Sequence, residues 1–126
     1  MTIIEYPGDE DTPRSHLPFS PVTRVGNLLF VSGQASVDAT GKIVSDSFEG
    51  EMRRSMDNLR KVLESAGSGL EHVAMTRNYI GDPADGPAFN QLYREYFKAP
   101  FPARTTISKC LGNLKYEIDC IAVVPG

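Results

Sequence analysis

The chain has 126 residues, of which 40% are hydrophobic, and these values fit one packed domain rather than a disordered segment. Its 13 basic and 16 acidic residues give a net charge of −3 without any basic block, which argues against a nucleic-acid partner. No apolar stretch approaches the ~20 residues that a membrane helix needs, so we expect no membrane association.

The start of the chain and its cysteines predict a compartment. Residues 1–7 lack the basic segment and apolar run of a signal peptide. Cys110 and Cys120 lie in strand-like segments, and they do not form the pattern of a disulfide scaffold. We interpret both as free core thiols in a reducing compartment, and we expect a cytoplasmic protein.

The first part of the chain predicts an irregular arm followed by a hairpin. Residues 1–21 are rich in proline and charge, and at most one short strand fits at their beginning. Two apolar runs, 22–25 and 28–32, then flank Gly26-Asn27, which is typical of a β-hairpin. A turn at 38–41 leads into a short apolar run at 42–44 that could add a strand.

The clearest helix follows and is about 20 residues long. Asp46 with Glu49 resembles a capping box at its start, and Gly67 suits the left-handed residue expected at its end. Apolar residues recur every three or four positions along it: Phe48, Met52, Met56, Leu59, Leu63 and Ala66.

The second half predicts a strand, a helix and two strands. Alternation indicates a strand over 73–79, and the pairs Asp82-Pro83 and Gly86-Pro87 then break the chain. A helix follows with an apolar stripe from Phe89 to Phe97, and the segments 103–109 and 114–123 read as strands. In the last strand one face carries Leu114, Tyr116, Ile118 and Cys120, and the other carries Glu117, Asp119 and Ile121.

This order of elements predicts an α+β fold, a single domain over residues 1–126 in which a mixed β-sheet carries two helices packed on one face. No internal repeat or linker suggests a second domain. The sheet face away from the helices bears polar and apolar side chains, and a small domain could bury it by forming an oligomer.

Several catalytic devices are absent from the sequence. It contains neither a phosphate-binding glycine loop nor a dinucleotide fingerprint. His16 and His72 are the only histidines, and neither has a partner at ligand spacing, so we expect no metal site.

Three local features could carry chemistry. Arg104 follows Pro102-Ala103 at the head of a strand, and its guanidinium could hold a carboxylate through two hydrogen bonds or form a surface salt bridge. Glu117 interrupts an apolar strand, where a carboxylate is either solvent-facing or functional. Gly33, after Ser32 at a strand end, permits close approach of a ligand or is an ordinary turn residue. Asn90, in the expected first turn of the second helix, is unremarkable by itself.

Taken together, the segments from about Pro18 to Val124 resemble the Rid (RidA/YjgF) family of imine and enamine deaminases. The first part of the resemblance is the strand pair that ends in Ser-Gly-Gln at 32–34. The helical patterns at 55–59 and 89–97 also match. The most specific signatures are Phe-Pro-Ala-Arg at 101–104 and Tyr-Glu-Ile-Asp-Cys-Ile-Ala-Val at 116–123.

The resemblance implies a fold, an assembly and an activity. Rid proteins are homotrimers of chorismate-mutase-like subunits with active sites in the clefts between subunits. They hydrolyse reactive 2-imino and enamine acids, such as 2-aminoacrylate, to 2-keto acids and ammonia without a cofactor. We therefore expect a small-molecule imino or keto acid as the ligand.

The resemblance also implies roles for individual residues. Arg104 matches the arginine that grips the substrate carboxylate, and Glu117 matches the glutamate that positions water or relays a proton. The backbone at Thr106 matches a position that bonds the substrate, and Ser32, Gly33 and Asn90 match residues that line or support the pocket.

Three departures from the family pattern stand out. Phe19 occupies a substrate-binding position where many deaminating members have tyrosine, Thr106 stands where many have cysteine, and the connection at 109–113 is short. Three other functions stay open: a non-catalytic trimeric protein that binds metabolites, a divergent Rid hydrolase, and a ribonuclease or translation inhibitor. The acidic net charge disfavours the last of these.

Overall fold

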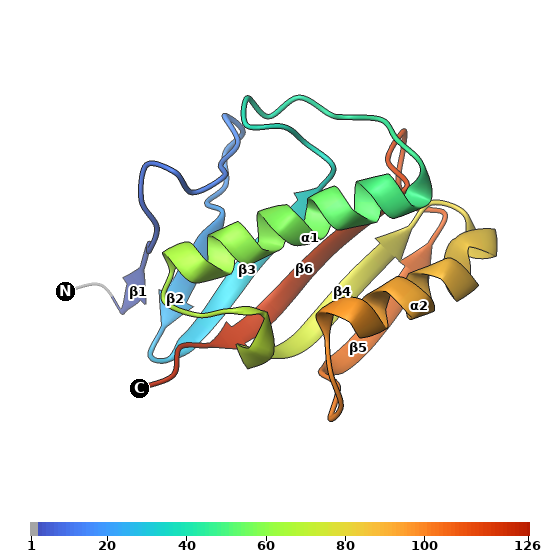
Figure 1. Ribbon diagram of the computed structural model, residues 1–126. Helices are drawn as coiled ribbons and strands as arrows, with labels where there is room; N and C mark the ends of the chain where they lie inside the picture. Colours follow the sequence, from blue (N-terminus) through green and yellow to red (C-terminus); the bar gives the residue numbers. More distant parts are fainter. Residues whose placement is uncertain (1–2) are drawn as a thin grey trace.

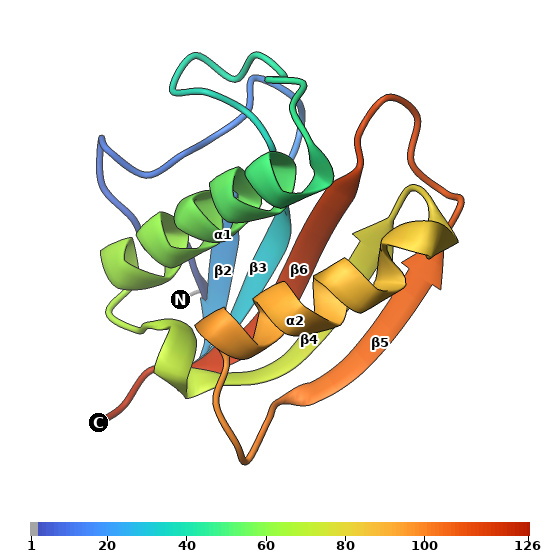
Figure 2. The same ribbon diagram turned by 45° about the vertical axis from the view of Figure 1, so that its right-hand side comes forward.

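The computed structural model describes residues 3–126, so Met1 and Thr2 of the expected arm lie outside the described residues. Six strands form one sheet in the order β1-β2-β3-β6-β4-β5. Helices α1 and α2 both cover the same face of it (Figures 1 and 2). The bounds are β1 Ile4–Glu5, β2 Val22–Val25, β3 Leu28–Ala35, α1 Phe48–Ser65, β4 Val73–Ile80, α2 Gly86–Tyr96, β5 Ala103–Ser108 and β6 Tyr116–Val123. The predicted α+β class and the two helices on one face are confirmed.

The pairing of the strands makes the sheet mixed, as predicted. Strands β2 and β3 form the expected antiparallel hairpin, and β6 pairs antiparallel with both β3 and β4. Strand β5 runs parallel to β4, because α2 connects them as a crossover. Strand β6 therefore lies near the middle of the sheet, and β5 forms one edge (Figure 2).

Helix α1 begins one residue later than the capping pattern predicts. Ser47, not Asp46, is the cap, because its Oγ accepts a hydrogen bond from the Gly50 N–H at 3.1 Å. The Asp46 carboxylate instead accepts from the Ser47 N–H at 2.7 Å. At the other end, the prediction for Gly67 is confirmed: it has a φ of 84° and closes the helix.

Helix α2 begins three residues before its apolar stripe, which starts at Phe89. It starts at Gly86, with Pro87 in its first turn, where a missing N–H breaks no helical hydrogen bond. Asn90 consequently lies in the second turn of the helix rather than the first. The interpretation of Gly86-Pro87 as a break in the chain was wrong.

Three further expectations need correction. Residues 42–44 form no strand, and only an isolated bridge joins Val37 to Ile43. Strand β6 starts at Tyr116, two residues after the predicted beginning. Cys110 lies outside the strands and is exposed, whereas Cys120 is buried; both thiols are free, as predicted.

The core lies between the sheet and the two helices. Alternate residues of β3 and β6 face it, as do the apolar stripes of both helices. Its most enclosed members include Leu29, Met52, Met56, Leu59, Leu63, Phe89, Tyr116 and Ile118. The side chains between them on β6, Glu117 and Asp119, therefore point to the face that the helices leave open.

Candidate functional site

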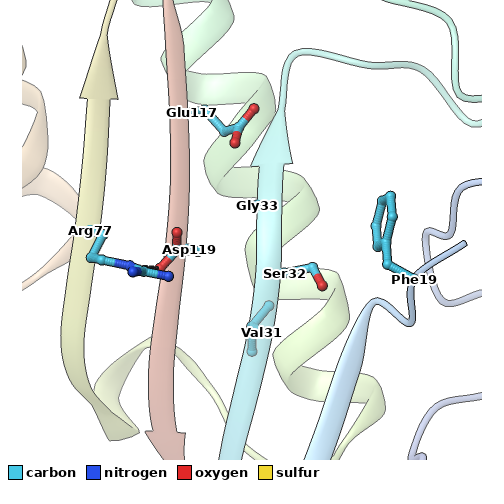
Figure 3. Close-up of a pocket in the computed structure, with 7 residues that line it drawn as sticks. All are labelled: Phe19, Val31, Ser32, Gly33, Arg77, Glu117 and Asp119. Atoms are coloured by element: carbon cyan, nitrogen blue, oxygen red, sulfur yellow. Dashed lines mark hydrogen bonds and ion pairs between the residues drawn. The ribbon is translucent and has the colours of Figure 1, made fainter. Parts of the chain in front are cut away.

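An open cavity of about 410 Å³ lies on the helix-free face of the sheet (Figure 3). Strands β3, β4 and β6 supply its floor, and the N-terminal arm supplies one wall. The cavity is lined by Phe19, Val31, Ser32, Gly33, Arg77, Glu117 and Asp119. Four of these, Phe19, Ser32, Gly33 and Glu117, are site residues proposed from the sequence, and the fold brings them together.

Glu117 lies on the central strand with its carboxylate directly over Gly33. A Cβ atom at position 33 would lie 2.5 Å from Glu117 Oε2 and 3.0 Å from Cδ, so only glycine leaves room for the carboxylate there. Burial raises the pKa of Glu117, and the nearby Asp119 raises it further. No residue of 3–126 donates a hydrogen bond to this carboxylate, which leaves both of its oxygens open to the cavity.

Ser32 connects the arm to the sheet and so places Phe19. Its Oγ donates to the Ser20 carbonyl at 2.6 Å, and its N–H donates to the Pro21 carbonyl at 2.9 Å. The irregular pairing between Val31 and Gln34 falls at this point of β3. The aromatic ring of Phe19, half exposed, therefore forms the wall of the cavity across from the sheet.

Two residues of the cavity, Arg77 and Asp119, were not proposed from the sequence. Arg77 Nε donates to Asp119 Oδ1 at 2.8 Å, and the Tyr79 hydroxyl donates to Asp119 Oδ2 at 2.8 Å. The sequence did contain a signal, because alternation already put Asp119 on the same face as Glu117. What it lacked was the register of β4 against β6, which sets Arg77 opposite Asp119.

Arg104 lies on the other face of the sheet. It pairs in register with Thr76, which is buried under α2, and its guanidinium lies over the rings of Phe89 and Tyr93 at 4.8 and 4.9 Å. Among residues 3–126 no carboxylate lies within ion-pair distance of it. The alternative of a surface salt bridge within the chain is therefore not what the structure shows.

Arg104 has a small depression of its own, about 180 Å³ in volume, between α2 and β5. Asn90 lines it together with Tyr93, Arg94, Phe101 and Pro102. Thr106 lies two residues after Arg104 on the same edge strand and lines neither cavity. The proposed site residues thus fall into two groups, one on each face of the sheet.

A buried chain of hydrogen bonds fixes the ring beneath Arg104. The hydroxyls of Tyr93 and Thr76 share a hydrogen bond of 2.7 Å, Asn78 Nδ2 donates to Thr76 Oγ1 at 2.9 Å, and the Tyr116 hydroxyl donates to Asn78 Oδ1 at 2.6 Å. This chain joins α2, β4 and β6 through the core. Arg104 therefore rests on an aromatic surface whose position is set from inside the domain.

Residues 3–126 lack the features of two other kinds of site. No group of three or more His, Cys, Asp or Glu side chains gathers as it would to hold a metal ion. In the same part of the chain, no helix combines the length and apolar character needed to span a membrane.

The fold and the sequence both match known proteins. The model of the family described as Endoribonuclease L-PSP matches residues 9–124, nearly the whole chain. The chain belongs to the Rid (RidA/YjgF) family. The Rid resemblance of the sequence is thereby confirmed.

Curated relatives and a solved structure agree with this membership. Reactive Intermediate Deaminase A, chloroplastic, of Arabidopsis thaliana is 34% identical over 123 residues, which are 95% of this chain and 66% of that protein. The 2-iminobutanoate/2-iminopropanoate deaminase of Dermatophagoides farinae is 31% identical, and the match covers 85% and 86% of the two chains. A Yersinia pestis Rid protein of unknown function, YyfA, superposes with a TM-score of 0.88 at 28% identity, covering 96% and 99%.

Proposed function

We propose that this Rid protein is a hydrolytic deaminase that converts reactive 2-imino and enamine acids into 2-keto acids and ammonia. The observation that carries the proposal is the half-buried Glu117 carboxylate, which has no hydrogen-bond donor among residues 3–126 and faces an open cavity. The names of the two deaminase relatives support the same reaction class.

The residues fit the chemistry of imine hydrolysis. Arg104 binds the substrate carboxylate and orients the adjacent C=N bond. The substrate reacts as its protonated imine. Glu117 takes a proton from water as the water oxygen adds to the imine carbon and the C=N π electrons move to nitrogen, which gives a neutral carbinolamine. Glu117 then returns its proton to the carbinolamine nitrogen, the C–N bond breaks and ammonia leaves. The hydroxyl proton passes to solvent, which leaves the keto group. An enamine substrate first needs a proton at its terminal carbon.

We propose further that a homotrimer builds the complete site. Arg104 and Glu117 lie on opposite faces of one sheet, so Arg104 of one copy must meet Glu117 of another for both to touch one small substrate. The helix-free face supports such an assembly, because apolar side chains on it are 37–42% exposed: Val25, Leu28, Phe30, Ile107 and Val123. Association of copies would bury them.

The proposed reaction needs no metal or organic cofactor, because hydrolysis changes no oxidation state, the carboxylate moves the protons and the guanidinium binds the substrate carboxylate. We also propose the cytoplasm as its compartment, which the free thiols of Cys110 and Cys120 support.

A coupled assay tests the proposal. An amino-acid oxidase generates 2-imino acids, and release of keto acid is followed with and without the protein. We expect faster release with the wild type and a loss on the order of 10²–10⁴-fold in Glu117→Gln. Glu64→Gln, which changes an exposed carboxylate on α1, is the matched control. Binding of a keto acid without any turnover would instead favour the metabolite-binding function.

A further inference from the structure

Glu117 shares its face of β6 with a second carboxylate, and the two have opposite surroundings. Both oxygens of Asp119 accept hydrogen bonds from β4, one from Arg77 Nε and one from the Tyr79 hydroxyl, each at 2.8 Å. The Asp119 side chain is 17% exposed. Glu117, two residues away and half-buried, receives no such bond in residues 3–126.

Besides Glu117, the ionisable side chains that line its cavity are Arg77 and Asp119. Strand β4 contributes Arg77 and Tyr79, and Tyr79 is the direct cross-strand neighbour of Glu117. Strand β6 contributes Asp119, and β3 presents no ionisable side chain. The Arg77 guanidinium is bound through Nε to Asp119. Asp119 is the charged neighbour that raises the pKa of Glu117.

We propose, resting on the deaminase function above, that Asp119 is a positioning residue. Held by Arg77 and Tyr79, it keeps a negative charge beside Glu117 and thereby strengthens Glu117 as the base that takes a proton from the attacking water.

The physical basis is the repulsion between two like charges in a partly desolvated cavity. Burial raises the pKa of Glu117 first, and Asp119 adds to the effect. A carboxylate with a higher pKa is a stronger base and operates closer to neutral pH, which favours general acid–base catalysis. The two hydrogen bonds on Asp119 prevent it from turning toward the water itself. Two carboxylates on one strand thus acquire separate tasks through their partners.

Two variants with opposite expected effects test the proposal. Asp119→Asn removes the anion, so the midpoint at which Glu117 titrates should fall. Arg77→Gln removes the cation and leaves the anion, so the midpoint should rise. Both midpoints are read from the ¹³C resonance of the Glu117 carboxyl in the assembled full-length protein. The control, Asp57→Asn, removes a carboxylate from another Asp–Arg pair of 2.8 Å, on the surface of α1 with Arg60.

The catalytic part of the proposal is read from the pH profile of kcat/KM for imine hydrolysis. The rate rises with pH as Glu117 ionises, so in Asp119→Asn this acidic limb should move to lower pH together with the midpoint. The plateau above it should fall, because Glu117 has become a weaker base. Asp57→Asn should leave both unchanged. A merely structural role for Asp119 would lower the plateau without moving the limb.

The outcomes separate this proposal from the function on which it rests. The proposal is overturned if the titration midpoint of Glu117 is unchanged in both variants. It is also overturned if the midpoints shift while the acidic limb of the kcat/KM profile stays in place. If Asp119→Asn does not fold, an unchanged midpoint in Arg77→Gln is enough to overturn it. Wild-type protein that hydrolyses no imine, yet shows the two opposite shifts, would refute the deaminase function and retain the control of Glu117 by Asp119.

Discussion

Arg104 and Glu117 lie on opposite faces of the same sheet, and each lines a cavity of its own. Arg104 faces α2 from the edge strand β5, whereas Glu117 faces the helix-free side from the central strand β6. One small substrate cannot touch both within a single chain. A site that uses both residues therefore has to be assembled from two copies.

Mixing two inactive variants should restore activity. Arg104→Ala chains retain Glu117 and Glu117→Gln chains retain Arg104, so a mixed assembly contains sites with both native residues. Random assembly of equal amounts into trimers should give about a quarter of the wild-type activity, because each site draws one residue from each of two neighbours. The measurement is keto-acid release after the variants are refolded together.

The control is a chain that carries both substitutions, refolded with Arg104→Ala, which leaves no source of Arg104. That mixture should stay inactive. Equal inactivity of the complementary mixture, with hybrid trimers demonstrated by mass spectrometry, would show that Arg104 and Glu117 do not share one site.

Arg104→Lys should reduce kcat/KM for imine hydrolysis at least about tenfold, because charge-assisted hydrogen bonds contribute roughly 1.5–3 kcal/mol each and lysine cannot reproduce the planar fork. Arg104→Ala should reduce it further. The melting temperature should change by only a few degrees, since an exposed cation–π contact contributes about 0.5–1 kcal/mol. An unfolded Arg104→Ala protein, or one as active as the wild type, would contradict the proposed role.

Gly33→Ala should inactivate the enzyme while leaving it folded. The new methyl would occupy the space of Glu117 Oε2, so the carboxylate has to turn away from its place in the cavity. Gly112→Ala is the control, because a Cβ there meets nothing within 4 Å. Keto-acid release and thermal unfolding distinguish the two variants, and full activity of Gly33→Ala would show that the position of Glu117 over Gly33 does not matter.

Glu117→Gln should make the folded protein more stable than the wild type at neutral pH. The pKa of Glu117 is raised in the folded state, chiefly by burial, so the folded state binds its proton more tightly than the unfolded state does. The free energy of unfolding of the wild type then falls as the pH rises from the pKa of Glu117 in the unfolded chain through its higher pKa in the folded protein. In urea unfolding, the glutamine variant should have a higher free energy of unfolding than the wild type near pH 7, and this difference should disappear near pH 4. An equal difference in the free energy of unfolding at both pH values would rule out ionisation of Glu117 as its cause.

The sequence predicted most of what depends on local periodicity. The apolar spacing along α1 identified its buried face, and alternation along β6 separated Glu117 and Asp119 from the core. The start of α2 was missed because Gly86-Pro87 looks like a break, although a proline costs little in the first turn of a helix.

The missed part of the candidate site depends on contacts that are distant in sequence. Arg77 meets Asp119 only through the register of β4 on β6, and Phe19 reaches the cavity because Ser32 binds the arm at Ser20. Neither contact leaves a repeating pattern in the sequence. Residues of this kind become visible only once the strands are paired.

The place of β5 at the edge of the sheet gives the two halves of the site different local stability. Strand β6 is hydrogen-bonded on both sides, whereas β5 is bonded only to β4, and all six of its residues are exposed. Amide protons of β5 should therefore exchange with solvent through small local openings, whereas amide protons around Glu117 should exchange only when a larger part of the sheet unfolds. The segment that presents Arg104 is thus the looser half, and any neighbour that docks on this edge would slow its exchange.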